Sequence, residues 1–247
     1  MEWNSGLYDK KHDFVAEYGK GLLEFIPHNP KQTILDLGCG TGTLTAQLAD
    51  MCDKVIGVDS SQSMIEKAKF QFGDIEFIVC NALDLPYENK FDVAFSNAVF
   101  HWINDHDALL ESIYKALKPQ GLLVCEFGAK GNIATIENAF LKVCNRLGYH
   151  YVPKFNFPTA DTFGAMLQTH GFTIEKIYEY DRPTILKDSE QGLSNWIKQF
   201  FASELAEMPE NIQTQVIKEM EERTRDALWN GESWVADYRR LRAIAHR

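Results

Sequence analysis

Short apolar runs alternate with amphipathic stretches along most of this chain, which is the pattern of strands alternating with helices. Five continuously apolar runs predict buried strands at residues 33–37, 55–59, 77–80, 91–95 and 122–127. The stretches between them repeat apolar residues every three or four positions; one predicted helix carries Leu110, Ile113, Tyr114 and Leu117 on a single stripe. Buried strands linked by helices predict a parallel sheet covered on both faces.

The rest of the chain adds helices and two more strands to this pattern. We expect helices at 13–26, 132–147, 160–170, 191–206 and 210–228, and strands at 172–180 and 234–245. The predicted fold class is α/β, with a Rossmann-like, seven-stranded, mostly parallel sheet, an N-terminal helical lid and a helical insertion at about 187–228. We expect one domain over 1–247, divided into a lid (1–30), a cofactor-binding core (31–128) and a substrate-side half (129–247).

Composition and charge narrow the class of protein. Hydrophobic residues make up 45% and charged residues 24% of the chain, as in ordinary globular proteins. A net charge of −10 disfavours nucleic-acid binding, although a local basic patch could still hold a small anion. The five scattered cysteines include no CxxC pair, so we expect neither disulfides nor a metal site. Without an apolar run of about 20 residues we expect no membrane span, and a cytoplasmic location.

A glycine-rich turn follows the first predicted strand and is the sharpest chemical signal. Asp36-Leu37-Gly38-Cys39-Gly40-Thr41-Gly42 lies between a strand and a helix, where glycines let a ligand approach the backbone closely. Asp59 ends the next strand, where a carboxylate can accept both hydroxyls of an adenosine ribose.

The residues around this turn discriminate between nucleotides. A dinucleotide fingerprint requires a third glycine at position 43, which is Thr43 here, so a nicotinamide oxidoreductase is the weaker alternative. A buried carboxylate at Asp36 would repel a pyrophosphate and suit a ligand with a cationic group, such as an α-ammonium. In a second interpretation, Asp36 only accepts hydrogen bonds from backbone N–H groups of the turn.

Five motifs occur in order over about residues 31–128: ILDLGCGTG, VIGVDSS, NALDLP, FDVAFSNAVFHW and LKPQGLLV. In this order they resemble class I S-adenosylmethionine-dependent methyltransferases, and within that class the small-molecule branch that includes trans-aconitate methyltransferase. The segments WNSGLYDKKHDF and WVADYRRLRAIA, near the two ends, are also similar to that branch. The resemblance implies S-adenosylmethionine as the cofactor and a small-molecule acceptor.

The resemblance also implies residue roles. Asp36, Gly38 and Gly40, with Cys39 between them, would line the methionine part of the cofactor. The remaining cofactor-binding residues would be Asp59 at the ribose, Ser60 and Met64 beside the sugar and adenine, Asn81 and Ala82 at the adenine edge, Asn97 near the methyl donor, and Tyr8 in the lid. Many relatives have Asp where this chain has Asn81, so the adenine contact is expected to be weaker here.

Catalytic candidates lie at the predicted carboxyl ends of the strands and in the segment before the first predicted helix. His101 follows the fourth strand, where it would orient a substrate carboxylate or act as a base; alternatively, it only caps the next helix or forms a hydrogen bond in the wall of the site. Tyr8 and His12, which precede the helix expected at 13–26, are further candidates. No His/Asp pair stands at an obvious motif position, and a carboxylate acceptor, which is already ionised at pH 7, needs no base; we therefore expect a carboxylic acid O-methyltransferase. A quinol, lipid or amine acceptor, and a non-catalytic cofactor-binding module, remain alternatives.

Two features of the second half bear on the acceptor. Candidate anion-binding residues are Lys154, Arg182, Arg239 and Arg240, although each taken singly is typical of solvated surface charge. Two apolar stripes indicate helix core or, alternatively, a hydrophobic roof over a substrate; they are Leu193, Trp196, Ile197, Phe200 and Phe201, and Ile212, Val216 and Met220.

Overall fold

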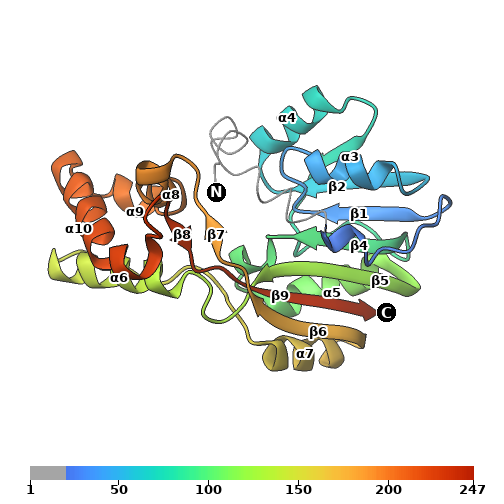
Figure 1. Ribbon diagram of the computed structural model, residues 1–247. Coiled ribbons are helices and arrows are strands. Elements are labelled where there is room, and N and C mark those ends of the chain that lie inside the picture. The colour runs from blue at the N-terminus through green and yellow to red at the C-terminus, as the bar shows by residue number, and fades with distance from the viewer. Residues whose placement is uncertain (1–20) are drawn as a thin grey trace. The chain divides into compact units, whose positions relative to one another are not determined.

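The computed structural model describes residues 21–247, and their main sheet has seven strands in the order β3-β2-β1-β4-β5-β9-β6 (Figure 1). Strands β3, β2, β1, β4 and β5 pair in parallel, whereas the arrow of β9 points against that of β1. The strands are β1 Thr33–Leu37, β2 Lys54–Asp59, β3 Glu76–Val79, β4 Phe91–Asn97, β5 Leu117–Gly128, β6 Thr173–Asp181 and β9 Arg239–His246. The predicted α/β fold with a mostly parallel seven-stranded sheet is confirmed.

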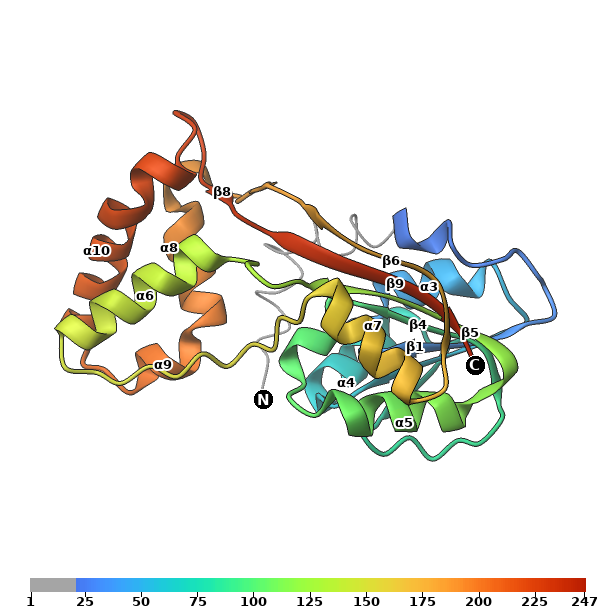
Figure 2. The ribbon, with the colours of Figure 1, turned by 90° about the horizontal axis from the view of Figure 1, so that it is seen from below.

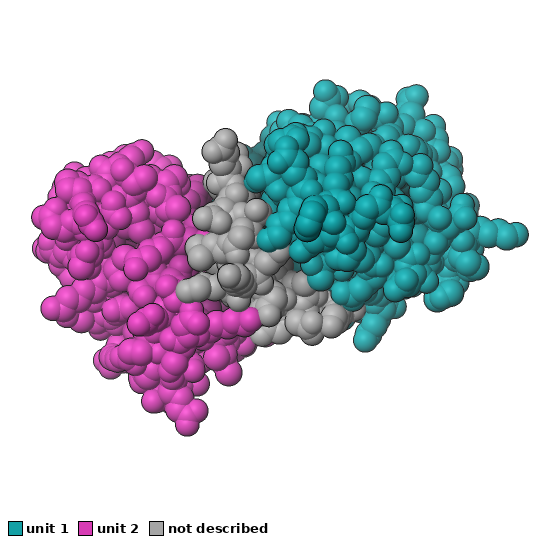
Figure 3. All heavy atoms as spheres, turned by 90° about the horizontal axis from the view of Figure 1, so that it is seen from above, with its two compact units in different colours: residues 1–128, 158–179, 241–247 teal, residues 129–157, 180–240 magenta. Residues whose placement is uncertain are grey.

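The chain divides into two compact units (Figure 3). Unit 1 comprises residues 1–128, 158–179 and 241–247, of which 1–20 lie outside the described residues; unit 2 comprises 129–157 and 180–240. Strands β6 and β9 each contribute residues to both units. The expected single domain, with its lid, core and second half, stays a prediction.

The helices of unit 1 cover both faces of its sheet (Figure 2). Val124 of β5 belongs to the core cluster of Leu22 and Leu48 on one face. Phe127 of the same strand points to the other face, because it lies an odd number of residues away, and its ring packs 4.9 Å from that of Phe163. The helices of this unit are α3 Thr43–Ala49, α4 Gln62–Gln71, the 3₁₀ turn η1 Phe100–Trp102, α5 His106–Ala116 and α7 Ala160–Thr169.

Unit 2 is built around four helices and a short antiparallel pair of strands. Its core contains the predicted apolar stripes, since Leu193, Ile197, Val216 and Met220 have no exposed surface. The Phe201 ring stacks on Phe140 at 4.1 Å. The stripes are therefore helix core, the first of the two interpretations. The elements are α6 Ala134–Arg146, β7 Thr184–Ile185, the 3₁₀ turn η2 Ser189–Gln191, α8 Gly192–Phe200, α9 Ala202–Ala206, α10 Glu210–Leu228 and β8 Val235–Ala236.

Several boundaries differ from the sequence expectations. Leu117 begins β5 and does not end α5, because proline at position 119 disfavours a helix there. The helix expected at 191–206 breaks at Phe201, which leaves the helical conformation. The strand expected at 234–245 is divided into β8 and β9. Across residues 21–247, no helix has both the length and the apolar character needed to cross a bilayer.

Candidate functional site

The turn between β1 and α3 is held against the end of β2 by backbone hydrogen bonds. The N–H groups of Gly38 and Cys39 donate to the carbonyl oxygen of Val58, at 2.7 and 3.0 Å. Gly38 and Gly40 have φ values of +75° and +55°, and Gly42, at +86°, precedes the first turn of α3. This left-handed backbone is accessible to glycine at little cost, which explains three glycines in five residues.

The glycines of the turn face different surroundings. A Cβ atom at Gly38 would lie 2.2 Å from Cγ2 of Val99, so the segment after β4 packs directly on this glycine. A Cβ atom at Gly40 would meet no atom of residues 21–247 within 4 Å. Gly38 is therefore required by packing inside the protein. With respect to the described residues, the backbone of Gly40 is open to the approach of a ligand.

Asp36 is a carboxylate buried at the end of β1. Its exposed fraction is 2%, and among the described residues Thr45 is the side chain that donates to it, with Oγ1 at 2.7 Å from Oδ2. Burial raises the pKa of Asp36 to about 7, the Thr45 hydroxyl acts against that rise, and the charge of Asp59 adds to it. The N–H groups of Gly38 and Cys39 bond to Val58, and that of Gly40 bonds to Asp59. The role of Asp36 stays a prediction.

Asp59 connects the turn to the following helix. Its Oδ2 accepts from the N–H of Gly40 at 3.1 Å, and its Oδ1 accepts from the N–H of Ser61 at 2.8 Å. Burial raises the pKa of Asp59, and these two N–H groups oppose the rise. The Ser61 hydroxyl caps α4 by accepting from the N–H of Met64, whereas Ser60 is exposed.

The predicted adenine-side residues follow β2 and β3. The N–H of Cys80 donates to the Asp59 carbonyl at 2.9 Å, which joins the ends of the two strands. Asn81 is exposed, and its Oδ1 accepts from the N–H of Leu83 at 3.1 Å in a local turn. An amide oxygen has two lone pairs, so this turn does not prevent a contact with adenine. The roles of Asn81, Ala82, Ser60 and Met64 stay predictions.

The segment after β4 reaches back over the glycine turn. Asn97 ends β4 opposite Glu126 of β5, and the N–H of Ala98 donates to the Glu126 carbonyl at 2.7 Å. Ala98 has φ of +61°, an uncommon conformation for a residue with a side chain. This conformation lies between Asn97 and Val99, the residue that contacts Gly38.

His101 lies in η1 and has an exposed fraction of 8%. The N–H of Gly128 donates to its Nδ1 at 3.3 Å, so Nδ1 must be the unprotonated nitrogen. The neutral ring then carries its proton on Nε2. In this tautomer the lone pair of Nδ1 is engaged by the Gly128 N–H, and the ring presents Nε2–H as a donor. The bond also fits a histidine that is hydrogen-bonded in the wall of the site, and the role of His101 stays a prediction.

The remaining functional candidates lie outside the described residues or in unit 2. Tyr8 and His12 lie outside the described residues. In unit 2, Lys154 Nζ is 2.9 Å from Glu204 Oε2, and Arg239 Nη1 is 2.6 Å from Asp181 Oδ1. The guanidinium groups of the other two cationic candidates lie over tyrosine rings; these residues are Arg182 and Arg240.

Sequence reasoning missed Thr45, Val99 and a buried ion pair. Thr45 is nine residues from Asp36, and only the fold shows that its hydroxyl meets the carboxylate. The ion pair joins Arg242 of β9 to Glu126, with Nη2 at 2.5 Å from Oε2. A carboxylate inside the apolar run at 122–127 was a signal that the strand needed a buried cationic partner.

The arrangement fits S-adenosylmethionine on the geometry of unit 1. Asp36 is a buried carboxylate for which the structure, over residues 21–247, shows the Thr45 hydroxyl as a side-chain partner, and this suits a cationic group such as the α-ammonium. The open space at Gly40 admits a ligand to bare backbone. Asp59 stands beside Gly40 at the end of β2, where a ribose can be held.

Comparisons with known proteins agree with this assignment. Residues 35–125 match the family model described as "Methyltransferase domain". An uncharacterised methyltransferase of Schizosaccharomyces pombe is 29% identical over 99% of this chain and 98% of its own length. Trans-aconitate 2-methyltransferases are also similar, but the match spans about half of each chain. The Deinococcus radiodurans protein is 34% identical over 55% of this chain and 53% of its own, and an Escherichia coli protein 32% over 51% and 50%.

Solved structures share the fold. A putative methyltransferase of Bacillus halodurans superposes with a TM-score of 0.63 at 14% identity, covering 94% of this chain and 97% of its own. A geranyl diphosphate C-methyltransferase of Streptomyces coelicolor, solved with S-adenosyl-L-homocysteine, gives a TM-score of 0.58 at 17% identity, covering 94% of this chain and 76% of its own.

Proposed function

We propose that this chain, whose residues 35–125 match the methyltransferase domain, acts as an S-adenosylmethionine-dependent methyltransferase on a carboxylate oxygen of a small-molecule acid. The observation that carries the proposal is the hydrogen bond from the Gly128 N–H to Nδ1 of His101. It leaves the histidine of the site as a donor, which suits an acceptor that is already ionised. The similarity to trans-aconitate 2-methyltransferases supports the same class of acceptor.

When bound, S-adenosylmethionine supplies an electrophilic methyl group, whose transfer to a carboxylate oxygen breaks the sulfur–methyl bond, leaves the electron pair on sulfur and moves no proton. The protein contributes binding, alignment and exclusion of water. Asp36 holds the α-ammonium, Asp59 holds the ribose hydroxyls, and Gly38 and Gly40 present bare backbone. His101 donates from Nε2 to the acceptor carboxylate and fixes which oxygen faces the methyl group.

Turnover tests the acceptor class directly. The purified chain is incubated with S-adenosylmethionine and matched panels of carboxylic acids, amines and quinols, and S-adenosylhomocysteine is quantified. We expect turnover with the acids and a product that mild alkali hydrolyses, as a methyl ester requires. Turnover confined to amines or quinols would replace the proposed acceptor class. Cofactor binding without any turnover would indicate a binding module.

Two isosteric variants test the role of His101. In His101→Asn the amide oxygen can still accept from the Gly128 N–H, but the distal donor is lost. In His101→Gln the amide nitrogen reproduces that donor. We expect KM for the acid to rise about tenfold in His101→Asn, equivalent to about 1.4 kcal/mol, and to stay within about threefold in His101→Gln.

The pH profile separates this role from base catalysis. If His101 were a general base, both variants would lose kcat alike and the acidic limb of the kcat profile would disappear. An unchanged profile together with the KM difference supports the donor role.

A further inference from the structure

A short turn joins the end of α10 to β8 in unit 2. Trp229 and Trp234 pair in an antiparallel bridge on either side of it, and the N–H of Asn230 donates to the Ser233 carbonyl at 3.1 Å. Gly231 has φ of +102°, in the region that favours glycine. Asn230 and Gly231 are both exposed, so water reaches the turn.

The side chain of Asn230 is held with its oxygen against two backbone donors. Its Oδ1 accepts from the N–H of Glu232 at 3.0 Å and from that of Ser233 at 2.8 Å. These donors draw electron density from Cγ and stand where negative charge would develop if a nucleophile added to that carbon. The carboxamide of Asn230 is therefore activated toward attack.

The backbone nitrogen of Gly231 is a nucleophile that can close a five-membered ring on this carbon. Over residues 21–247, its N–H donates no hydrogen bond, and a Cβ atom at Gly231 would meet no atom within 4 Å. Glycine has no side chain to hinder the approach of its own nitrogen. Ring closure within one chain also avoids the entropy cost of bringing two reactants together. The turn thus combines an activated carbon with an unhindered nucleophile.

Two other asparagines form a similar local turn and show what is particular to Asn230. Oδ1 of Asn29 accepts from the N–H of Lys31 at 3.0 Å, and Oδ1 of Asn81 accepts from that of Leu83 at 3.1 Å. Both asparagines are exposed. The proline after Asn29 has no N–H to become a nucleophile, and the alanine after Asn81 has a Cβ atom beside its nitrogen. Asn230 is the one asparagine in the sequence that glycine follows.

We propose that this turn makes Asn230 a site of spontaneous deamidation, which converts it into aspartate and isoaspartate. The Gly231 N–H loses its proton to hydroxide, and its nitrogen bonds to Cγ of Asn230. The C–N bond of the carboxamide then breaks, the departing nitrogen takes up a proton, and ammonia leaves a cyclic succinimide. Water opens this ring at either carbonyl. The sum converts carboxamide and water into carboxylate and ammonium, with no oxidation or reduction. The inference does not rest on the proposed function.

The isoaspartyl product changes the turn itself. Its main chain runs through the side-chain carbon, which adds one backbone atom between Trp229 and Trp234. The Trp234 indole donates to the Glu190 carbonyl at 2.9 Å, and the Arg225 guanidinium carbon lies 4.8 Å from the centre of the Trp229 ring. We expect the longer main chain to break the bridge between the two tryptophans and to loosen these contacts. The aspartyl product keeps the main chain and an oxygen for each N–H donor, so it should preserve the turn.

Timed incubation of the purified chain in mildly alkaline buffer tests the site. Peptide mass spectrometry follows a gain of about 1 Da at each asparagine, and electron-transfer fragmentation distinguishes isoaspartate from aspartate. We expect Asn230 to react at least tenfold faster than Asn29 and Asn81. Its rate should rise with pH, because the nucleophile must lose a proton. An intact Asn230, or a rate less than tenfold above that of Asn81, would overturn the proposal.

Two substitutions exchange the neighbouring residue. Gly231→Ala should slow the deamidation of Asn230 at least tenfold. Ala82→Gly should accelerate that of Asn81, whose Oδ1 accepts from one backbone N–H within residues 21–247, but leave it slower than Asn230. If Asn81 in Ala82→Gly reacts as fast as Asn230, the paired donors do not activate the carboxamide, and the role of the turn is overturned. Should Gly231→Ala fail to fold because of the positive φ, Ala82→Gly and the unchanged protein still decide.

The variant Asn230→Asp separates the effects of the two products. We expect it to melt within about 1 °C of the unchanged protein, whereas the isoaspartyl fraction, isolated by chromatography after incubation, should melt at least about 3 °C lower. An unchanged melting temperature of the isoaspartyl fraction would overturn the expected loss of the tryptophan bridge and leave the modification site standing.

Discussion

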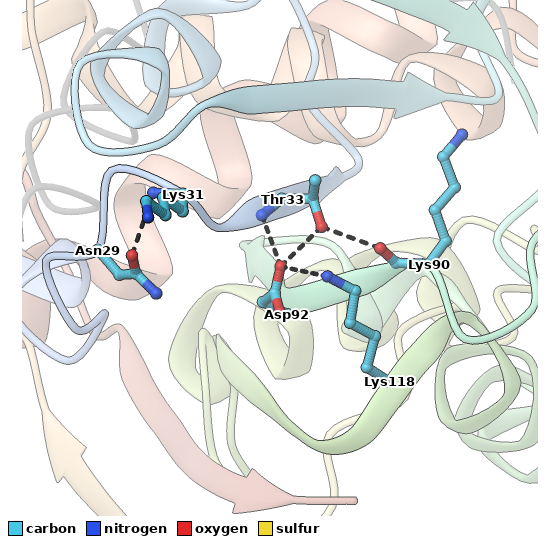
Figure 4. Close-up of polar contacts among 6 residues, drawn as sticks. All are labelled: Asn29, Lys31, Thr33, Lys90, Asp92 and Lys118. Carbon is cyan, nitrogen blue, oxygen red and sulfur yellow. Dashed lines mark hydrogen bonds and ion pairs between the residues drawn. The ribbon is translucent and has the colours of Figure 1, made fainter.

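The two ends of the parallel strands in unit 1 each carry a carboxylate, and the protein treats them in opposite ways. At the amino ends, Asp92 accepts from the Thr33 N–H and from Lys118 Nζ, both at 2.7 Å, and the Thr33 hydroxyl lies 2.8 Å away (Figure 4). That hydroxyl also lies 2.9 Å from the carbonyl oxygen of Lys90. At the carboxyl ends, Asp36 has the Thr45 hydroxyl.

The pKa values of the two groups follow this difference. Burial would raise the pKa of Asp92, but the hydrogen bonds from Lys118 and Thr33 outweigh it and lower the pKa. Burial dominates at Asp36 and raises its pKa to about 7. A carboxylate that the protein satisfies itself ties strands together. We expect Asp36, whose pKa is raised by burial, to be stabilised in its ionised form by a ligand that brings a positive charge.

Replacement of Asp36 by Asn is expected to have the largest effect. At pH 8, Asp36→Asn should weaken S-adenosylmethionine binding about 100-fold, or about 2.7 kcal/mol, because the ion pair between the carboxylate and the α-ammonium becomes a hydrogen bond from the ammonium to an uncharged amide. The melting temperature should not fall, since the substitution removes a buried charge. Titration calorimetry and thermal unfolding measure the two quantities. Equal affinities would show that Asp36 does not meet the cationic end of the cofactor.

The pH dependence of cofactor affinity should be the next largest effect. A bound cation lowers the pKa of Asp36, so binding releases a proton whenever the free protein carries one there. Affinity is therefore full above pH 7 and falls as pH decreases, by up to about tenfold per pH unit below 7. Asp36→Asn should remove this slope. S-adenosylhomocysteine, which keeps the ammonium, should show the same slope; a flat profile for both ligands would contradict the linkage.

Replacement of Asp92 by Asn should affect stability alone and by the smallest amount. Asp92→Asn keeps an oxygen for Thr33 and loses the ion pair with Lys118. That pair is partly exposed and therefore weakened by solvent. We expect the free energy of unfolding to fall by about 1 kcal/mol in urea denaturation, with S-adenosylmethionine affinity unchanged. A loss of affinity similar to that of Asp36→Asn would remove the contrast between the two ends of the sheet.

The sequence predicted the strands and the glycine turn because both have local signals. The continuous apolar runs correspond to β1 to β5, and the order of glycines and acids marks the turn at 36–42. The contacts that give individual side chains their roles join distant residues. The N–H that sets the tautomer of His101 belongs to Gly128, 27 positions away. The left-handed conformation of Ala98 depends on a bond to Glu126, and alanine itself gives no sign of it.

The four cationic candidates of unit 2 also show that local sequence does not predict the partner of a side chain. Their sequence context is alike, but Arg239 has an acid opposite on β6 and Arg240 has a tyrosine ring beside it. The direction of each side chain follows from strand alternation, which the sequence predicted. The partner on the neighbouring segment follows from strand register, which is determined by tertiary pairing.

The position of β9 in the sheet order has a consequence for how the protein is assembled. This strand lies between β5 and β6, although more than 50 residues of unit 2 separate it from β6 in sequence. Its two neighbours would otherwise each present a row of unpaired N–H and C=O groups. Pairing partners so distant in the chain close slowly during folding. Until residues 239–246 have inserted, the folding protein exposes the unpaired edges of two strands. We expect self-association and the need for chaperones to be greatest during this interval.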